Sequence, residues 1–146
     1  MHEQLNTYLK RFAWMNQQSG AAKTYVATRG GKVVGYYSLA YGSVEPAAAS
    51  TRIRQGLVRH PIPVMVLARL AVGHIEQGRG LGKGLLKDAL LRTLQAAEIA
   101  GLRAIVVPVK DEQARTFYEK FDFVRSPIDE FQLMLLIKDV RRLITG

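Results

Sequence analysis

The sequence predicts a single α/β domain, residues 1–146, built on a mixed, mostly antiparallel sheet with helices on both faces. Three observations lead to this prediction. The chain has 146 residues, which is the usual length of one domain. Apolar residues with helical spacing alternate along the chain with short apolar stretches typical of strands. Glycine and proline separate these stretches, and the implied order of elements is α-β-β-β-α-β-α-β-β.

The N-terminal part is expected to hold a helix followed by a hairpin. Apolar side chains recur at i, i+3, i+4 and i+7 within residues 3–18, which predicts an amphipathic helix. Residues 23–28 and 33–40 predict two strands joined by the turn R-G-G-K. Residues 45–63 contain three prolines and predict a long loop. Loops of this length in small domains are often functional.

The rest of the chain alternates strands with helices. A mostly apolar strand over residues 64–72 leads into a glycine-rich turn over 73–82, and a helix then runs to about Ala100. The remaining elements are predicted, in chain order, as a strand over 103–109, a helix over 111–121, strands over 122–125 and 131–137, and a short helical end over 138–146.

The composition excludes several classes of protein. The chain has no cysteine, which excludes disulfides, a thiol nucleophile and a zinc finger. Three scattered histidines predict no metal site. No apolar run approaches the ~18 residues that a membrane span needs, and the first residues do not resemble a signal peptide. A cytoplasmic protein without membrane contact is therefore expected.

The net charge predicts a polyanionic partner. Lys and Arg number 21 against 12 Asp and Glu, which gives +9, and the isoelectric point is about 10.1. The excess lies mainly in residues 1–63, where eight basic and two acidic residues give +6. A basic surface that binds only water and ions is the alternative at this point.

The sharpest motif is Q-G-R-G-L-G-K at residues 77–83, directly after a predicted strand and directly before a predicted helix. Glycine allows a tight turn, and the first amide groups of a helix favour an anion. The spacing fits neither the Walker loop nor the dinucleotide fingerprint. The motif predicts a phosphate site made by Gln77, Gly78, Arg79, Gly80, Leu81, Gly82 and Lys83. A glycine-rich turn without a ligand stays open as the other interpretation.

Two motifs together resemble the GNAT family of N-acetyltransferases. The stretch L-A-R-L-A-V followed by Q-G-R-G-L-G-K resembles the family's acetyl-CoA motif, Q/R-x-x-G-x-G/A. The later stretch D-E-Q-A-R-T-F-Y-E-K-F-D-F resembles its N-x-x-A-x-x-F-Y-x-x-x-G-F segment. The resemblance covers residues 3–138. It implies the GNAT fold, here without the usual first strand, and acetyl-CoA as cosubstrate.

The resemblance also implies where acetyl-CoA binds. Its pantetheine arm would pair with the strand backbone at Leu70, Ala71 and Val72, and its pyrophosphate would lie on the amides of residues 78–83. Asp111 and Phe117 of the second motif would complete the cofactor site. Asp111 replaces the family's asparagine, and aspartate caps a helix equally well.

The same resemblance implies that Tyr118 is the general acid that protonates the departing CoA thiolate. A phenol has a reference pKa of about 10 and a thiol one of about 8.5, so this proton transfer is reasonable at neutral pH. The other interpretation is a core residue, because Tyr118 shares an apolar stripe with Phe117 and Phe121. Asp122 replaces the family's glycine, where a left-handed backbone is expected.

Within the family, the chain is most similar to the acetyltransferase toxins of bacterial toxin–antitoxin pairs. The likeness lies in N-Q-Q-S-G before K-T-Y-V-A, in R-H-P-I-P and L-A-R-L-A-V, and in the ending L-M-L-L-I-K-D-V. It implies acetylation of the α-amino group of aminoacyl-tRNA, which stops translation, a ribbon-helix-helix antitoxin as partner, and a homodimer. Five cations are expected to contact RNA: Lys10, Arg11, Arg52, Arg54 and Arg59.

Two other functions remain open from the sequence. One is N-acetylation of a protein N-terminus or of a small amine. The other is a GNAT-like domain that binds CoA or nucleic acid without catalysis. The first lacks support because a polyamine acceptor would need an acidic pocket, and the strand and loop before the glycine motif carry no acid between Glu45 and Glu76.

Overall fold

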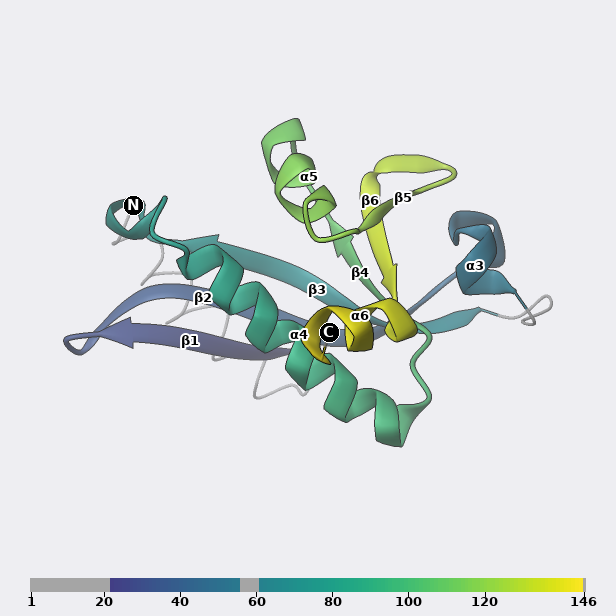
Figure 1. Ribbon diagram of the computed structural model, residues 1–146, viewed down its shortest axis with the longest axis horizontal. Helices are drawn as coiled ribbons and strands as arrows, with labels where there is room; N and C mark the ends of the chain where they lie inside the picture. Colours follow the sequence, from purple (N-terminus) through teal and green to yellow (C-terminus); the bar gives the residue numbers. More distant parts are fainter. Residues whose placement is uncertain (1–21, 56–60, 146) are drawn as a thin grey trace. The chain divides into compact units, whose positions relative to one another are not determined.

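The computed structural model describes residues 22–55 and 61–145 (Figure 1). The helix predicted over residues 3–18 lies outside this part of the chain. The described strands form one six-stranded sheet in the order β1-β2-β3-β4-β6-β5. Contacts divide the chain into two compact units, the first made of Met1–Ala40 and Leu67–Ala89 and the second of Tyr41–Val66 and Leu90–Gly146.

The first unit contains the predicted hairpin. Strand β1, Lys23–Arg29, pairs antiparallel with β2, Lys32–Val44, and Tyr25 lies opposite Tyr37. The two tyrosine rings stack with their centroids 5.1 Å apart. The turn between the strands holds two glycines with positive φ, which explains the R-G-G-K sequence. The hairpin prediction is confirmed, although β2 continues four residues beyond the predicted end at Ala40.

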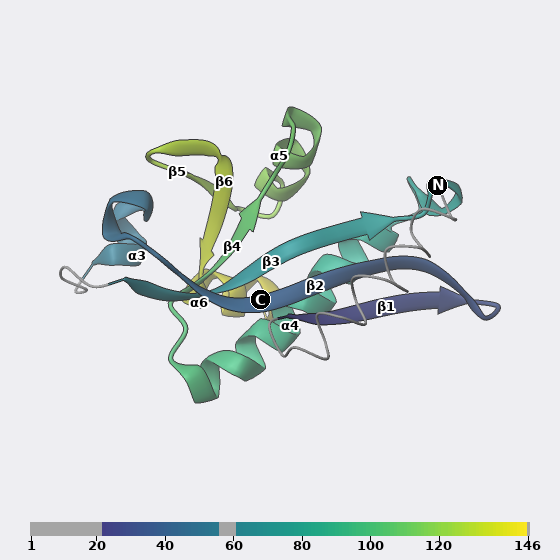
Figure 2. The ribbon, with the colours of Figure 1, turned by 180° about the vertical axis from the view of Figure 1, so that it is seen from behind.

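The first two turns of helix α4, Leu81–Ala100, pack on this hairpin. The close approach occurs at Gly35 of β2, where a Cβ atom would lie 2.9 Å from Leu85 Cδ1 and 3.1 Å from the carbonyl of Ala71. A glycine is therefore required for the helix to reach the sheet. Figure 2 shows the hairpin from behind, with the first turns of α4 on its far side. The predicted end of this helix at Ala100 is confirmed.

The second unit holds most of the remaining strands and helices. Strand β3, Ile62–Val72, begins here and pairs parallel with β4, Ala104–Pro108, while β4 pairs antiparallel with β6, Asp129–Leu136. Helix α5, Glu112–Glu119, the short strand β5, Val124–Ser126, and helix α6, Ile137–Thr145, match the predicted elements within a few residues. The parallel pair beside antiparallel pairs makes the sheet mixed, as predicted.

The prediction of a long loop over residues 45–63 is wrong for most of its described part. Two short helices form there, η2, Pro46–Ala48, and α3, Thr51–Arg54, and β3 already begins at Ile62. We call residues 45–55 the insert. Ser50 caps α3 by accepting a hydrogen bond from the amide of Ile53, and Ile53 is 1% exposed. Burial of this one side chain in the core of the second unit fixes a segment whose composition is typical of a loop.

Candidate cofactor site and basic surface

The glycine motif forms a tight turn between β3 and α4 in the first unit. Gly78 and Gly80 both have φ of +82°, a left-handed conformation that other residues adopt only with strain. A short helix, η3, His74–Glu76, precedes the turn. No atom lies within 4 Å of a Cβ built at either glycine, so glycine is needed for backbone conformation and the space above the turn is open.

The turn leaves amide groups without intrahelical partners. The first helical hydrogen bond of α4 runs from the amide of Gly84 to the carbonyl of Gly80, 3.1 Å away. The amides of Leu81, Gly82 and Lys83 precede that bond, and such groups at a helix start bind anions. The side chains of Arg79 and Lys83 are exposed beside them. This arrangement supports the predicted phosphate site.

The end of β3 is joined to this turn. The three predicted pantetheine-contacting residues, Leu70, Ala71 and Val72, are half-buried at the end of the strand. Gln77 Nε2 donates to the carbonyl of Val72 over 3.4 Å. The first unit therefore brings together every predicted cofactor residue of β3 and of the glycine motif.

Glu76 is a buried carboxylate within the predicted turn, and the sequence did not reveal its partner. It is 4% exposed, and its Oε2 atom lies 3.2 Å from Arg29 Nη2 of the hairpin. Its carbonyl accepts a hydrogen bond from the amide of Arg79. Glu76 thus links the glycine turn to the β1–β2 hairpin, a contact between residues too distant in sequence for a local pattern to reveal.

Tyr118 lies on α5 in the second unit, with Asp111 at the start of that helix. Asp111 Oδ1 accepts a hydrogen bond from the amide of Ala114 over 2.8 Å. Asp111 is therefore the N-cap of α5, as expected for an aspartate in place of the family's asparagine. The ring of Tyr118 is 5% exposed and packs edge-on against Phe117 and Phe123, at centroid distances of 5.0 and 5.5 Å. Burial raises the pKa of Tyr118 well above its usual value. The phenol therefore keeps its proton over the whole neutral range.

The turn after α5 confirms one further expectation. Asp122 has φ of 69° and is the one residue other than glycine with positive φ in the described part of the chain. Aspartate tolerates this conformation better than most residues. The replacement of the family's glycine at this position is therefore compatible with the same backbone path.

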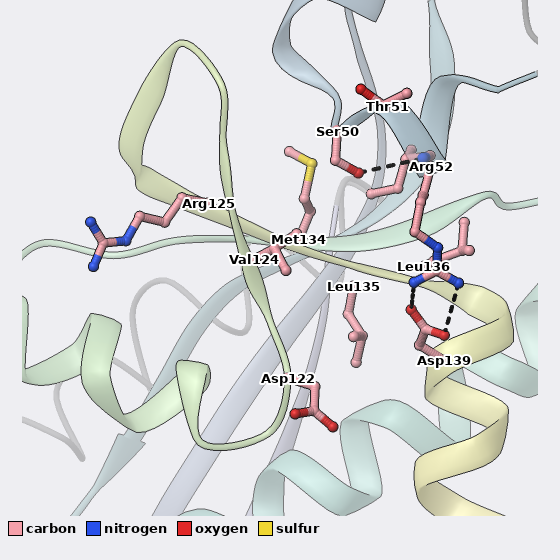
Figure 3. Close-up of a pocket in the computed structure, with 11 residues that line it drawn as sticks. Ser50, Thr51, Arg52, Asp122, Val124, Arg125, Met134, Leu135, Leu136 and Asp139 are labelled. Carbon is pink, nitrogen blue, oxygen red and sulfur yellow. Dashed lines mark hydrogen bonds and ion pairs between the residues drawn. The ribbon is translucent and has the colours of Figure 1, made fainter.

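The basic residues predicted to contact RNA have different surroundings. Lys10, Arg11 and Arg59 lie outside the described residues. Arg52 of α3 donates from Nη1 to Asp139 Oδ2 over 2.7 Å and from Nη2 to Oδ1 over 3.3 Å (Figure 3). This hydrogen-bonded pair raises the pKa of Arg52. Arg54 is exposed and makes no ion pair within residues 22–55 and 61–145.

Arg103, directly before β4, donates three hydrogen bonds to backbone carbonyls of the insert. Its Nε donates to the carbonyl of Ile53 over 2.8 Å, and its Nη2 donates to the carbonyls of Arg52 and Gln55 over 3.3 and 3.1 Å. Ser126 adds a hydrogen bond from its hydroxyl to the carbonyl of Ala48, 2.6 Å long. The insert that carries Arg52 and Arg54 is therefore a fixed part of the second unit, not a free loop.

A cavity of about 250 Å³ lies between the insert, β5, β6 and α6 (Figure 3). Both apolar and polar side chains line it; the lining consists of Ser50, Thr51, Arg52, Ile53, Asp122, Val124, Arg125, Met134, Leu135, Leu136 and Asp139. All these residues belong to the second unit.

No group of three or more His, Cys, Asp or Glu side chains in the described part of the chain could hold a metal ion. None of the described helices is both long and apolar enough to span a membrane.

Comparisons with known proteins identify the family. The family model described as an acetyltransferase (GNAT) domain matches residues 20–125. A tRNA-acetylating toxin of Mycobacterium tuberculosis is 50% identical over 140 residues, which cover 96% of this chain and 84% of that protein.

Two solved structures are also similar. AtaT complexed with acetyl-methionyl-tRNAfMet has 27% identity and a TM-score of 0.88, covering 99% of this chain and 88% of that one. A mutant of AtaT bound to the C-terminus of the antitoxin AtaR and to acetyl-CoA has 26% identity and a TM-score of 0.82, covering 99% of this chain and 86% of that one. The expected fold is confirmed, and the chain belongs to the GNAT family of acetyltransferases.

Proposed function

We propose that this protein is a toxin that transfers the acetyl group of acetyl-CoA to the α-amino group of aminoacyl-tRNA and so blocks translation. The observation that carries the proposal is the 50% identity, over 96% of the chain, to a tRNA-acetylating toxin. The similarity to AtaT in complex with an acetylated aminoacyl-tRNA supports the same substrate. The basic charge of +9 is consistent with a polyanionic substrate.

The first unit supplies the binding site for acetyl-CoA in this proposal. The cosubstrate provides the acetyl group as an activated thioester. The amides of residues 81–83 and the cations Arg79 and Lys83 bind its pyrophosphate. The backbone of residues 70–72 pairs with its pantetheine arm. Asp111 and Phe117 are the further cofactor residues that the family resemblance implies.

Tyr118 supplies the proton that completes the reaction. The neutral amine attacks the thioester carbonyl, a C–N bond forms, the C–S bond breaks, and the Tyr118 hydroxyl protonates the departing sulfur. An α-amino group has a pKa near 8, so a useful fraction is neutral at pH 7 without a strong protein base. Burial raises the pKa of Tyr118, so the phenol is protonated at neutral pH and holds the proton that it would donate.

The partners follow from the same proposal. A toxin of this kind needs an antitoxin, and AtaT has been solved with the C-terminus of the antitoxin AtaR. We expect a ribbon-helix-helix antitoxin, a homodimer and a cytoplasmic location, where aminoacyl-tRNA occurs. Size-exclusion chromatography with light scattering would test the homodimer directly.

One assay distinguishes the proposed function from its alternatives. The protein is incubated with acetyl-labelled acetyl-CoA and, in separate reactions, with aminoacyl-tRNA, deacylated tRNA, a peptide with a free N-terminus and a polyamine. Label on aminoacyl-tRNA alone is the expected result. Label on the peptide or polyamine instead would indicate the other acetyltransferase functions. Binding of acetyl-CoA without label on any acceptor would indicate a non-catalytic domain.

A further inference from the structure

Two arginines from different helices converge on one carboxylate in the second unit. Asp139 of α6 accepts the two hydrogen bonds of Arg52, and its Oδ1 also lies 3.7 Å from Nη1 of Arg142. The carboxylate is only 17% exposed, whereas the arginine side chains are 62% and 76% exposed. Both guanidinium groups therefore have N–H groups exposed to solvent. The single carboxylate neutralises the charge of only one of the two arginines. We call these three residues the arginine cluster.

The helices that carry the cluster are strongly basic. The sequences of α3, TRIR, and α6, IKDVRRLIT, contain five cations and a single acid, Asp139. The remaining cations, Arg54, Lys138 and Arg141, are all exposed. An isolated phosphate or a chain of phosphates would meet a favourable potential at this surface.

The same unit contains a comparable ion pair with opposite surroundings. Arg125 of β5 donates to Glu119 of α5 over 3.0 Å, with side chains 47% and 34% exposed. The charges of Glu130 and Glu112 also raise the pKa of Arg125. That arginine thus lies among acids, whereas Arg52 lies among bases. The Arg52–Asp139 pair therefore belongs to a cationic surface, whereas the Arg125–Glu119 pair does not.

We propose that the arginine cluster is a binding site for a backbone phosphate of the RNA substrate, and that the Asp139 carboxylate occupies the phosphate position in the free protein. Carboxylate and phosphate present similar paired oxygens to a guanidinium fork. Exchange costs little because the Arg52 side chain is 62% exposed, so water and salt screen its attraction to Asp139. Asp139 is also the third residue of α6, where the helix dipole stabilises a negative charge without Arg52. The inference rests on the proposed action on tRNA.

Binding of deacylated tRNA as a function of salt tests this site. Asp139→Asn removes a negative charge and keeps the side-chain shape. At about 5 Å, the repulsion between one carboxylate and one phosphate corresponds to about a two- to four-fold change in affinity at moderate salt. The variant should therefore bind tRNA about two- to four-fold tighter. Arg142→Gln should bind more weakly and reduce the slope of log affinity against log salt by about 0.7–0.9.

Glu119→Gln is the matched control. It removes one carboxylate from an exposed arginine pair and changes the net charge equally, but it should leave tRNA affinity unchanged. Equal tightening in both variants would show an effect of total charge and would overturn the proposal. Unchanged or weaker tRNA binding by folded Asp139→Asn, checked by its melting temperature, would do the same.

Two further results distinguish RNA binding from binding of an acidic protein and from loss of folding. If Asp139→Asn binds polyglutamate more tightly while its tRNA affinity is unchanged, the cluster recognises an acidic protein segment and the RNA proposal is wrong. If Asp139→Asn unfolds, Arg142→Gln decides, because that side chain is exposed; an unchanged salt slope would refute the site. Deacylated tRNA cannot be acetylated, so these measurements do not depend on the transfer reaction.

Discussion

Replacement of Tyr118 by phenylalanine tests the chemistry most directly. The substitution removes one oxygen and keeps the ring, so the edge-on contacts with Phe117 and Phe123 at 5.0 and 5.5 Å should survive. The side chain is 5% exposed, and an equal ring volume leaves no cavity behind. Any loss of activity at unchanged melting temperature must then come from the missing hydroxyl.

The size of the expected loss follows from the role of the hydroxyl. General acid catalysis contributes about 10²–10⁴ in rate. Burial raises the pKa of Tyr118 above its usual value, which makes the phenol a weaker acid and favours the lower end of that range. Initial rates of acetyl transfer to aminoacyl-tRNA, measured with saturating acetyl-CoA, should fall by about 10²–10³. Acetyl-CoA affinity should change little, because the lost interaction is made only in the transition state.

The pH profile gives a second, independent readout. Because the raised pKa keeps Tyr118 protonated, the wild-type rate should rise as the substrate amine, with a pKa near 8, loses its proton. No decline caused by Tyr118 should appear below about pH 10. Burial of the neutral phenol opposes its ionisation, so the matching loss of stability should begin only above that pH. Wild-type turnover by folded Tyr118→Phe would refute the assignment and leave Tyr118 as a core residue.

Three other perturbations test the remaining sites. Acetyl-CoA at 100 times its dissociation constant should stabilise the protein by about 2.7 kcal/mol and so raise its melting temperature. Gly80→Asp should abolish this rise, because it places a carboxylate at the pyrophosphate. Gly101→Asp, at a glycine with φ of +65° at the other end of α4, controls for backbone strain and should show the same rise as the wild type. Joint replacement of Arg52, Arg54 and Arg59 by alanine should reduce the salt slope of tRNA binding by about 0.7–0.9 per lost phosphate contact, and an unaltered slope would exclude the insert from the RNA surface. Ile53→Ala removes a side chain that is 1% exposed and should cost about 2–5 kcal/mol of unfolding free energy in chemical denaturation; a cost below that range would mean that the insert adds little to the core.

The sequence predicted the elements that local patterns determine. The helix from Leu81 to Ala100 has apolar spacing, a glycine turn before it and Gly101 after it, and its bounds were predicted closely. The hairpin turn and the cap at Asp111 follow from single residues with strong conformational preferences. Gly78 and Gly80 of the glycine motif have positive φ angles, so the tight turn before the helix could also be predicted from adjacent residues.

The insert could not be predicted because nothing local determines it. A helix of four residues is unstable alone, and this one forms only with its tertiary contacts. Its hydrogen bonds join residues 48–51 positions apart for Arg103, 78 for Ser126 and 87 for Asp139. No sequence window spans such distances. For the same reason, the sequence placed Arg52 on an open basic loop, whereas the structure shows it paired with Asp139.

These long separations set the order in which the protein can fold. During synthesis the insert leaves the ribosome well before Arg103, and Asp139 follows later still. Contacts between distant residues also form slowly, because the intervening chain must first be closed into a loop. The insert should therefore be among the last segments to adopt its final conformation. A nascent or C-terminally shortened chain would expose Ile53 and lack the partner of Arg52, so this surface matures only once α6 has been made.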